Sequence, residues 1–151
     1  MYVLGSLFLE TNQRKKAIDV FHQSLQINPK HSGSLNSLAY VYAEDGANLD
    51  EAETLASRAL QVDPDNGAYL DSLAWVYFKK GKYEEAIKTL QSAEQQLKDP
   101  IIYEHLGDVN YKLDRFDNAE KYWEQSLELN PGQTEVVKKL NDLKKVQAKS
   151  N

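Results

Sequence analysis

The chain has 151 residues, a net charge of −5 and no cysteine. That length suits one soluble globular unit, and the lack of cysteine excludes disulfides and cysteine metal sites. No apolar run approaches the ~18 residues of a membrane span, and the opening MYVLGSLFLE lacks the features of a signal peptide. We expect a cytoplasmic protein, although a signal removed ahead of this chain would leave export open.

The charge is unevenly distributed along the chain. From Thr134 onward five lysines face two acidic residues, a balance of +3, so the preceding body carries −8. Nucleic acids require a basic footprint, and an acidic body does not provide one. The charge pattern therefore argues against a DNA or RNA partner.

The first two units expected along the chain are residues 1–31 and 32–66, and each reads as a helix, a turn and a second helix. Proline follows the second helix in both, where a helix must stop. The second unit has one extra residue, between Gly46 and Asp50, which predicts a longer turn. The corresponding turn positions in the four units are Asn12, Gly46, Gly81 and Asp114.

The third unit, residues 67–99, begins with a helix that has two apolar rows. One row suits a core at the i, i+3, i+4, i+7 spacing: Leu70, Leu73, Ala74 and Tyr77. A second row contains Asp71, Trp75 and Phe78 and points about 100° or more away. This second row requires a separate explanation.

The fourth unit, residues 100–133, follows a favourable helix start, because Asp99 can cap the helix and Pro100 can take its first turn. Asn110 stands where the third unit has Tyr77, so a tyrosine is expected there. The side chain of the neighbouring Tyr111 could therefore take either a core or a groove position. Trp123 occupies the large core position of the second helix, and we expect it to be structural.

Residues 134–148 predict a final amphipathic helix that caps the fourth unit. Its apolar residues are expected to cover that unit, and its lysines to face water: Val136, Val137, Leu140 and Leu143 against Lys138, Lys139, Lys144 and Lys145. A basic helix of this kind could also touch an anionic membrane. Its apolar stripe is short and lacks a large aromatic residue, which favours capping over a membrane partner.

Several marks recur at intervals of 33 to 35 residues. A leucine and a small residue recur in each first helix: Leu4-Gly5, Leu38-Ala39, Leu73-Ala74 and Leu106-Gly107. An alanine recurs in each second helix: Ala17, Ala52, Ala86 and Ala119. This pattern resembles the tetratricopeptide repeat family. The resemblance implies an all-α fold, a right-handed α-solenoid of stacked antiparallel helical hairpins, over the whole chain.

The resemblance also implies that the first helices line a concave groove, where the family usually holds extended peptides. The positions that face the groove are carried over as Asn36, Tyr40, Asp71, Trp75, Phe78, Lys79, Glu104, Asp108, Tyr111 and Lys112. The second row of the third unit would then point into this groove.

An aromatic strip with an acidic rim predicts the chemistry of the partner. The strip would contain Tyr40, Trp75, Phe78 and Tyr111, and the rim Asp71, Glu104 and Asp108. We expect a protein or peptide that offers apolar side chains and at least one lysine or arginine. Two interpretations of Trp75 stay open, a partner anchor or packing between units, and Phe78 favours packing.

One subclass of the family binds the acidic C-termini of chaperones through a clamp of lysine, asparagine and arginine. The corresponding residues here do not match: Tyr2, Ser6, Ser37, Ala68 and Ser72. An acidic groove would also repel an acidic ligand. We therefore exclude that partner.

The sequence contains no arrangement typical of catalysis or of a cofactor site. The histidines are scattered over three units, and Glu104, His105 and Asp108 are better explained as a surface ion pair than as a metal site. No phosphate-binding loop is present. We expect neither an enzyme nor a cofactor or metal.

The sequence thus predicts a non-catalytic scaffold that binds an extended partner segment. The alternative is self-association, or a place within a larger array, through the end of the first unit. The repeat units resemble those of bacterial repeat arrays. Sedimentation over a concentration range would separate the two functions.

Overall fold

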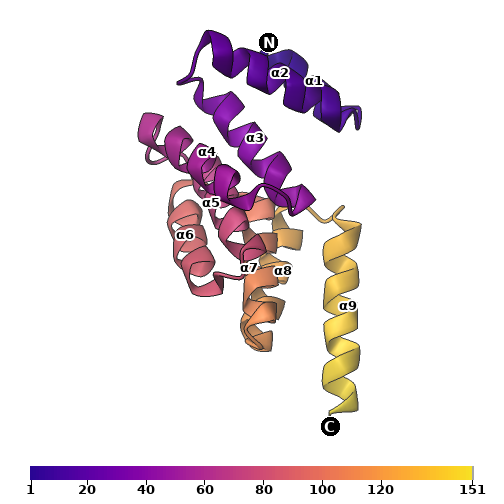
Figure 1. Ribbon diagram of the computed structural model, residues 1–151. Coiled ribbons are helices and arrows are strands. Elements are labelled where there is room, and N and C mark those ends of the chain that lie inside the picture. The colour runs from indigo at the N-terminus through magenta and orange to yellow at the C-terminus, as the bar shows by residue number, and fades with distance from the viewer. Residues whose placement is uncertain (151) are drawn as a thin grey trace.

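The computed structural model describes residues 1–150, over which the chain forms nine α-helices and no strand. The helices form four antiparallel hairpins and a final single helix, with the two termini at opposite ends of the stack (Figure 1). The pairs are α1 (Tyr2–Glu10) with α2 (Arg14–Ile27), α3 (Ser32–Asp45) with α4 (Leu49–Val62), α5 (Gly67–Lys79) with α6 (Tyr83–Gln96), and α7 (Pro100–Lys112) with α8 (Phe116–Leu129). The last helix is α9 (Thr134–Lys149). The predicted all-α solenoid of stacked hairpins is confirmed.

The turn inside each hairpin depends on a residue with a left-handed backbone. The φ angles are 57° at Asn12, 65° at Gly46, 76° at Gly81 and 55° at Asp114. Glycine, asparagine and aspartate tolerate this conformation better than other residues do. The extra residue of the second hairpin is accommodated in its turn, where Asn48 also has a positive φ, of 53°.

Within a hairpin, a small residue on the first helix allows a large side chain of the second helix to approach. A Cβ atom on Gly107 would overlap the indole of Trp123, and one on Gly5 would overlap the ring of Phe21. Trp123 is buried, as expected of a core residue. These contacts explain why leucine followed by a small residue recurs in each first helix.

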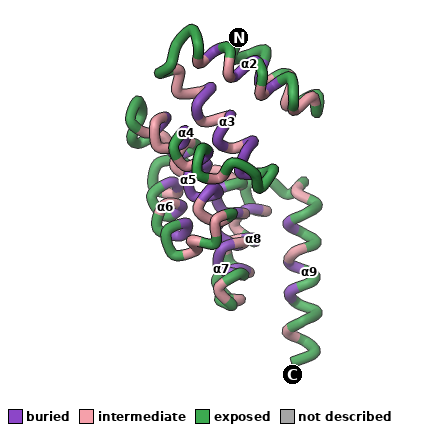
Figure 2. The backbone as a smooth tube through the Cα atoms, viewed as in Figure 1, coloured by how far each residue is buried: buried purple, intermediate pink, exposed green. Residues whose placement is uncertain are grey.

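Between hairpins, the second helix of one packs against the first helix of the next: α2 on α3, α4 on α5 and α6 on α7. The leucine and valine of each covered first helix are therefore buried, as Leu38 and Val41 are in α3. Successive first helices also touch, α3 with α5 and α5 with α7. Buried residues are most frequent on α3, α5 and α7, whereas α9 is mainly exposed and green in Figure 2.

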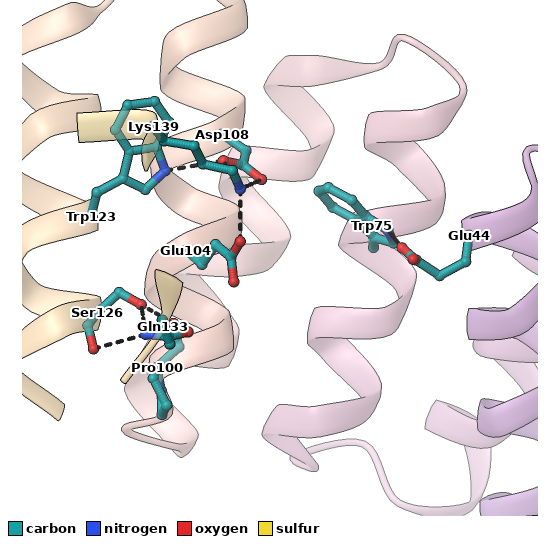
Figure 3. A network of polar contacts seen from close by, with 9 residues as sticks. All are labelled: Glu44, Trp75, Pro100, Glu104, Asp108, Trp123, Ser126, Gln133 and Lys139. Carbon is teal, nitrogen blue, oxygen red and sulfur yellow. Dashed lines mark hydrogen bonds and ion pairs between the residues drawn. The ribbon is translucent and has the colours of Figure 1, made fainter. Parts of the chain in front are cut away.

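The final helix α9 packs against α8 through Val136, Leu140 and Leu143, which are buried. Val137, predicted to cover the fourth hairpin as well, is instead exposed, because it lies on the outer side of α9. The start of α9 is fixed by hydrogen bonds (Figure 3). Gln133 Nε2 donates to Ser126 Oγ at 2.7 Å, and Ser126 Oγ donates to the Pro100 carbonyl at 2.7 Å.

Candidate functional site

The ten residues predicted to face a groove all lie on first helices, and the structure collects seven of them in two hollows. The first hollow, of about 310 Å³, lies at the ends of α5 and α7 beside α9 and is lined by Phe78, Asp108, Tyr111, Lys112, Trp123, Lys139, Asp142 and Leu143. The second, of about 320 Å³, lies at the starts of α5 and α7 and is lined by Asn36, Tyr40, Ala68, Asp71, Ser72, Leu97, Asp99, Ile101 and Ile102. We call these the C-terminal hollow and the N-terminal hollow.

Trp75 lies between the two hollows, in the middle of α5, and only 8% of its surface is exposed. Its indole stacks between Phe78, with ring centroids 4.6 Å apart, and His105, at 4.0 Å. The indole N–H donates to the carboxylate of Glu44 on α3 (Figure 3). Trp75 therefore joins α3, α5 and α7, and the packing interpretation is correct. It does not offer the exposed ring that a partner anchor needs.

Lys79, near the end of α5, is exposed and approaches this aromatic stack. Its Nζ atom is 5.2 Å from the centroid of the Trp75 ring, within the range of a cation–π contact. Lys79 lines neither hollow.

Asp71 and His105 form a buried pair across the third and fourth hairpins, with His105 Nδ1 2.7 Å from Asp71 Oδ1. Burial by itself lowers the pKa of His105, but the Asp71 carboxylate and its hydrogen bond, with Asp108 and Glu104, outweigh burial and raise that pKa above its ordinary value. The expectations of a surface ion pair at His105 and of an exposed Asp71 rim are both wrong. The two side chains fill the space between α5 and α7.

The remaining rim acids, Glu104 and Asp108, are already paired within the chain. Lys139 of α9 reaches back to α7, with its Nζ 2.7 Å from Glu104 Oε1 and 2.8 Å from Asp108 Oδ1 (Figure 3). The Trp123 indole also donates to Asp108, at 3.0 Å. Burial lowers the pKa of Lys139, but the two carboxylates outweigh this and raise it. Lys139 was expected to face water, and that prediction is wrong.

The C-terminal hollow has an aromatic wall and a charged edge. Tyr111 is 40% exposed, and its ring lies 5.7 Å from Trp123 and 5.5 Å from Phe116. Phe78 is half-buried on the opposite helix. Tyr111, which the sequence left between core and groove, therefore presents a ring to the hollow that is supported from behind by other rings.

The N-terminal hollow is lined by Asp99 and by Asp71, which is paired with His105, and by no lysine or arginine, so Asp99 makes it acidic. The Asn36 Oδ1 atom is buried there without a hydrogen-bond partner. Burial, followed by the charges of Glu44, Asp71 and Glu104, raises the pKa of the Tyr40 hydroxyl, so Tyr40 remains a neutral donor. An unpaired acceptor beside acidic groups suits a ligand that brings hydrogen-bond donors and positive charge.

Two further features of the described residues bear on alternative functions. Among residues 1–150, no cluster of three or more histidine, cysteine or acidic side chains has the geometry to hold a metal ion. None of the helices described is both long and apolar enough to cross a membrane. The face formed by α3, α5 and α7, which we call the inner face, carries aromatic rings and paired charges.

This fold and face define a helical-repeat protein of stacked hairpins. The family model for the cytochrome c-type biogenesis protein H TPR domain matches residues 2–102, and a general tetratricopeptide repeat model matches residues 100–133. The chain belongs to the tetratricopeptide repeat family. Members of this family are typically non-catalytic scaffolds that bind other proteins, and the chain's membership supports that class of function.

Individual relatives agree with this assignment. The Photosystem I assembly protein Ycf3 of Acaryochloris marina (strain MBIC 11017) is 36% identical over 59 residues, 35% of this chain and 36% of that protein. The chain therefore spans little more than a third of the length of this curated relative. The structure of PilF from Pseudomonas aeruginosa is 26% identical with a TM-score of 0.83, covering 98% of this chain and 68% of that one.

Another structure shows the likeness of fold alone. A thermophilic tetratricopeptide repeat protein from Thermus thermophilus is 19% identical with a TM-score of 0.82, over 94% of this chain and 78% of that one. At 19% sequence identity, this likeness shows a shared fold and does not allow binding residues to be compared.

Proposed function

We propose that the chain is a non-catalytic scaffold that holds an extended segment of a partner protein along its concave face. The observation that carries this proposal is the pair of hollows on one inner surface, one with an exposed aromatic wall and one acidic. Exposed aromatic rings held rigidly from behind are typical anchors of protein interfaces. The name of the relative Ycf3, an assembly protein, is consistent with such a function.

The partner would insert an apolar side chain into the C-terminal hollow, against Tyr111 and Phe78. These two rings, and not the buried ring of Trp75, would form the aromatic contact with the partner. A lysine or arginine of the partner would enter the N-terminal hollow, where Asn36 has an unpaired acceptor and Asp99 supplies a carboxylate. Asp71 would contribute little, because it is already paired with His105. Glu104 and Asp108 would contribute less, because both are already paired with Lys139.

The two hollows also suggest a spacing for the partner's anchors. Ile101 and Tyr111 line opposite hollows and lie ten residues apart on α7, which corresponds to about 15 Å along the helix. An extended peptide advances ~3.3 Å per residue. We therefore expect the apolar and basic anchors to be about four or five residues apart.

A peptide library can test this proposal directly. Peptides with one phenylalanine or leucine and one arginine, at separations of two to eight residues, would be titrated in fluorescence anisotropy. We expect the best binders at a separation of four or five residues, and a loss of binding when glutamate replaces arginine. A library without any preference for these anchors would contradict the proposal.

Variants would then locate the bound peptide. Tyr111→Ala should weaken binding by about tenfold or more, because it removes the exposed wall of the C-terminal hollow. The control is Tyr122→Ala, which changes the same residue type on α8 outside both hollows and should alter affinity by less than about twofold. Equal effects of the two substitutions would rule out the C-terminal hollow as the anchor site.

A further inference from the structure

The outer side of α1 is the second surface of interest, and it is separate from the concave groove. Three of its apolar side chains are exposed on that side: Val3, Leu4 and Leu7. Tyr2 is not part of this face, because its ring packs against Phe21 and His31. Leu4 and Leu7 are 45% and 51% exposed. No other helix described here carries so many exposed apolar residues on one side, so this face requires a physical explanation.

The other hairpins provide that explanation, because the same repeat positions are buried there. Leu38, Leu73 and Leu106 correspond to Leu4, and Val41, Val76 and Val109 correspond to Leu7. All six are buried. Each is covered because the second helix of the preceding hairpin, α2, α4 or α6, packs on its helix.

We propose that the outer face of α1 docks the second helix of a further helical hairpin stacked ahead of it. The occupant would be an amphipathic helix with an alanine and leucine stripe like that of α4, where Ala52, Leu55, Ala56 and Ala59 are buried. Three copies of this interface already exist within the molecule, and the α1 face has the apolar residues for a fourth.

The opposite end of the stack is closed to the same kind of growth. In α9, Asn141 stands where Gly107 and the other small residues meet the second helix of their own hairpin, and it is exposed. Lys144 and Lys145, one turn further, are exposed as well. A hairpin would have to bury these polar groups, so the structure favours extension at α1 only.

A fusion protein tests whether α1 accepts a hairpin. A duplicate of residues 67–102 placed directly before Met1 keeps the 33-residue spacing between the leucine of the duplicate, a copy of Leu73, and Leu4. If the hairpin docks, the fusion should melt in one transition, at least about 5 °C above the parent chain, because each stacked repeat adds an interface. A separate transition for the duplicate, with an unchanged parent transition, would overturn the proposal.

A matched substitution identifies the face that is used. Leu7→Glu should change the melting temperature of the parent chain by less than about 2 °C, since Leu7 is half exposed there, but should remove most of the gain in the fusion. Val62→Glu, on an exposed apolar position of α4, is the control and should leave the gain intact. Equal losses from both substitutions would overturn the proposed docking face.

Sedimentation of the parent chain separates this occupant from a second copy of the chain. We expect a monomer across the concentration range, because the exposed stripe on α1 alone is small beside the ~800 Å² per partner of a stable interface. A dimer that Leu7→Glu abolishes would assign the face to a second copy and overturn the proposal. Neither result affects peptide binding in the groove, which is tested by Tyr111.

Discussion

The two ends of the solenoid carry leucines at the same repeat positions and expose them to opposite degrees. Leu4 and Leu7 of α1 are 45% and 51% exposed, whereas Leu140 and Leu143 of α9 are 6% and 1% exposed. The residue type is therefore not what decides burial. A first helix buries these positions only where a second helix precedes it in the stack, as α8 precedes α9.

The ends also differ in polar contacts. At the C-terminal end, Lys139 joins α9 to Glu104 and Asp108 of α7, and Gln133 joins the start of α9 to α8. At the N-terminal end, α1 forms no cap hydrogen bond through a side chain and has no acidic residue in its first turn. The C-terminal end is thus covered and tied down by specific contacts, while the N-terminal end depends on packing against α2.

The largest expected difference between the ends concerns paired leucine substitutions. Leu143→Ala should lower the free energy of unfolding by about 2–5 kcal/mol, because it leaves a cavity under α9. Leu7→Ala should cost less than about 1 kcal/mol, because half of the side chain already meets water. Urea unfolding followed by circular dichroism measures both, and equal costs would contradict the comparison.

A smaller effect is expected for the lysine that holds the C-terminal end. Lys139→Met should destabilise the chain by about 1–3 kcal/mol, because Glu104 and Asp108 would remain partly buried without a cation. The control, Lys144→Met, removes a more exposed lysine that is 3.6 Å from Glu120, and should cost less than about 0.5 kcal/mol. Similar unfolding curves for the two variants would show that the Lys139 contacts add no stability.

The smallest effect concerns pH and the middle of the stack. Because the folded-state pKa of His105 is raised, its pairing with Asp71 stabilises the fold fully below the ordinary value of about 6.5, and this stabilisation is lost as pH rises through the raised pKa. Urea midpoints from pH 5.5 to 9 should therefore fall more in the parent chain than in His105→Gln.

The same pH series also checks that the ends behave independently of the middle. Leu143 belongs to the core cluster of Trp123, Val136 and Leu140, so Leu143→Ala should cost the same at pH 6 and pH 9. A cost that changes with pH would show that the C-terminal end is coupled to the buried pair. Parallel curves for the parent chain and His105→Gln would contradict the assigned effect of His105 itself.

The repeated marks were sufficient to predict the hairpins, because they are local in sequence. Helical spacing, the turn residues from Asn12 to Asp114 and the prolines after second helices each act over a few residues. The cap at Asp99 is also confirmed, with its carboxylate accepting from the Ile101 N–H at 2.8 Å. Trp123 was correctly placed in the core because Gly107 leaves space for it.

The character of the inner face could not be predicted in the same way, because its side chains choose partners across hairpins. Asp71 and His105 are 34 residues apart, one repeat length, which is the signal that could have suggested their contact. Lys139 lies 35 residues after Glu104, with the same implication. Position in the repeat indicates which way a side chain points, but not which charge or ring meets it there.

By itself, the sequence determined the helices, their pairing into hairpins and the repeat family, since these depend on spacing and small residues that any copy displays. Only the tertiary structure decided that Trp75 and Asp71 are buried, that Tyr111 is presented to a hollow, and that Lys139 pairs with Glu104 and Asp108 of α7. The physical reason is that burial and pairing depend on the neighbouring hairpin, which lies about one repeat away in sequence.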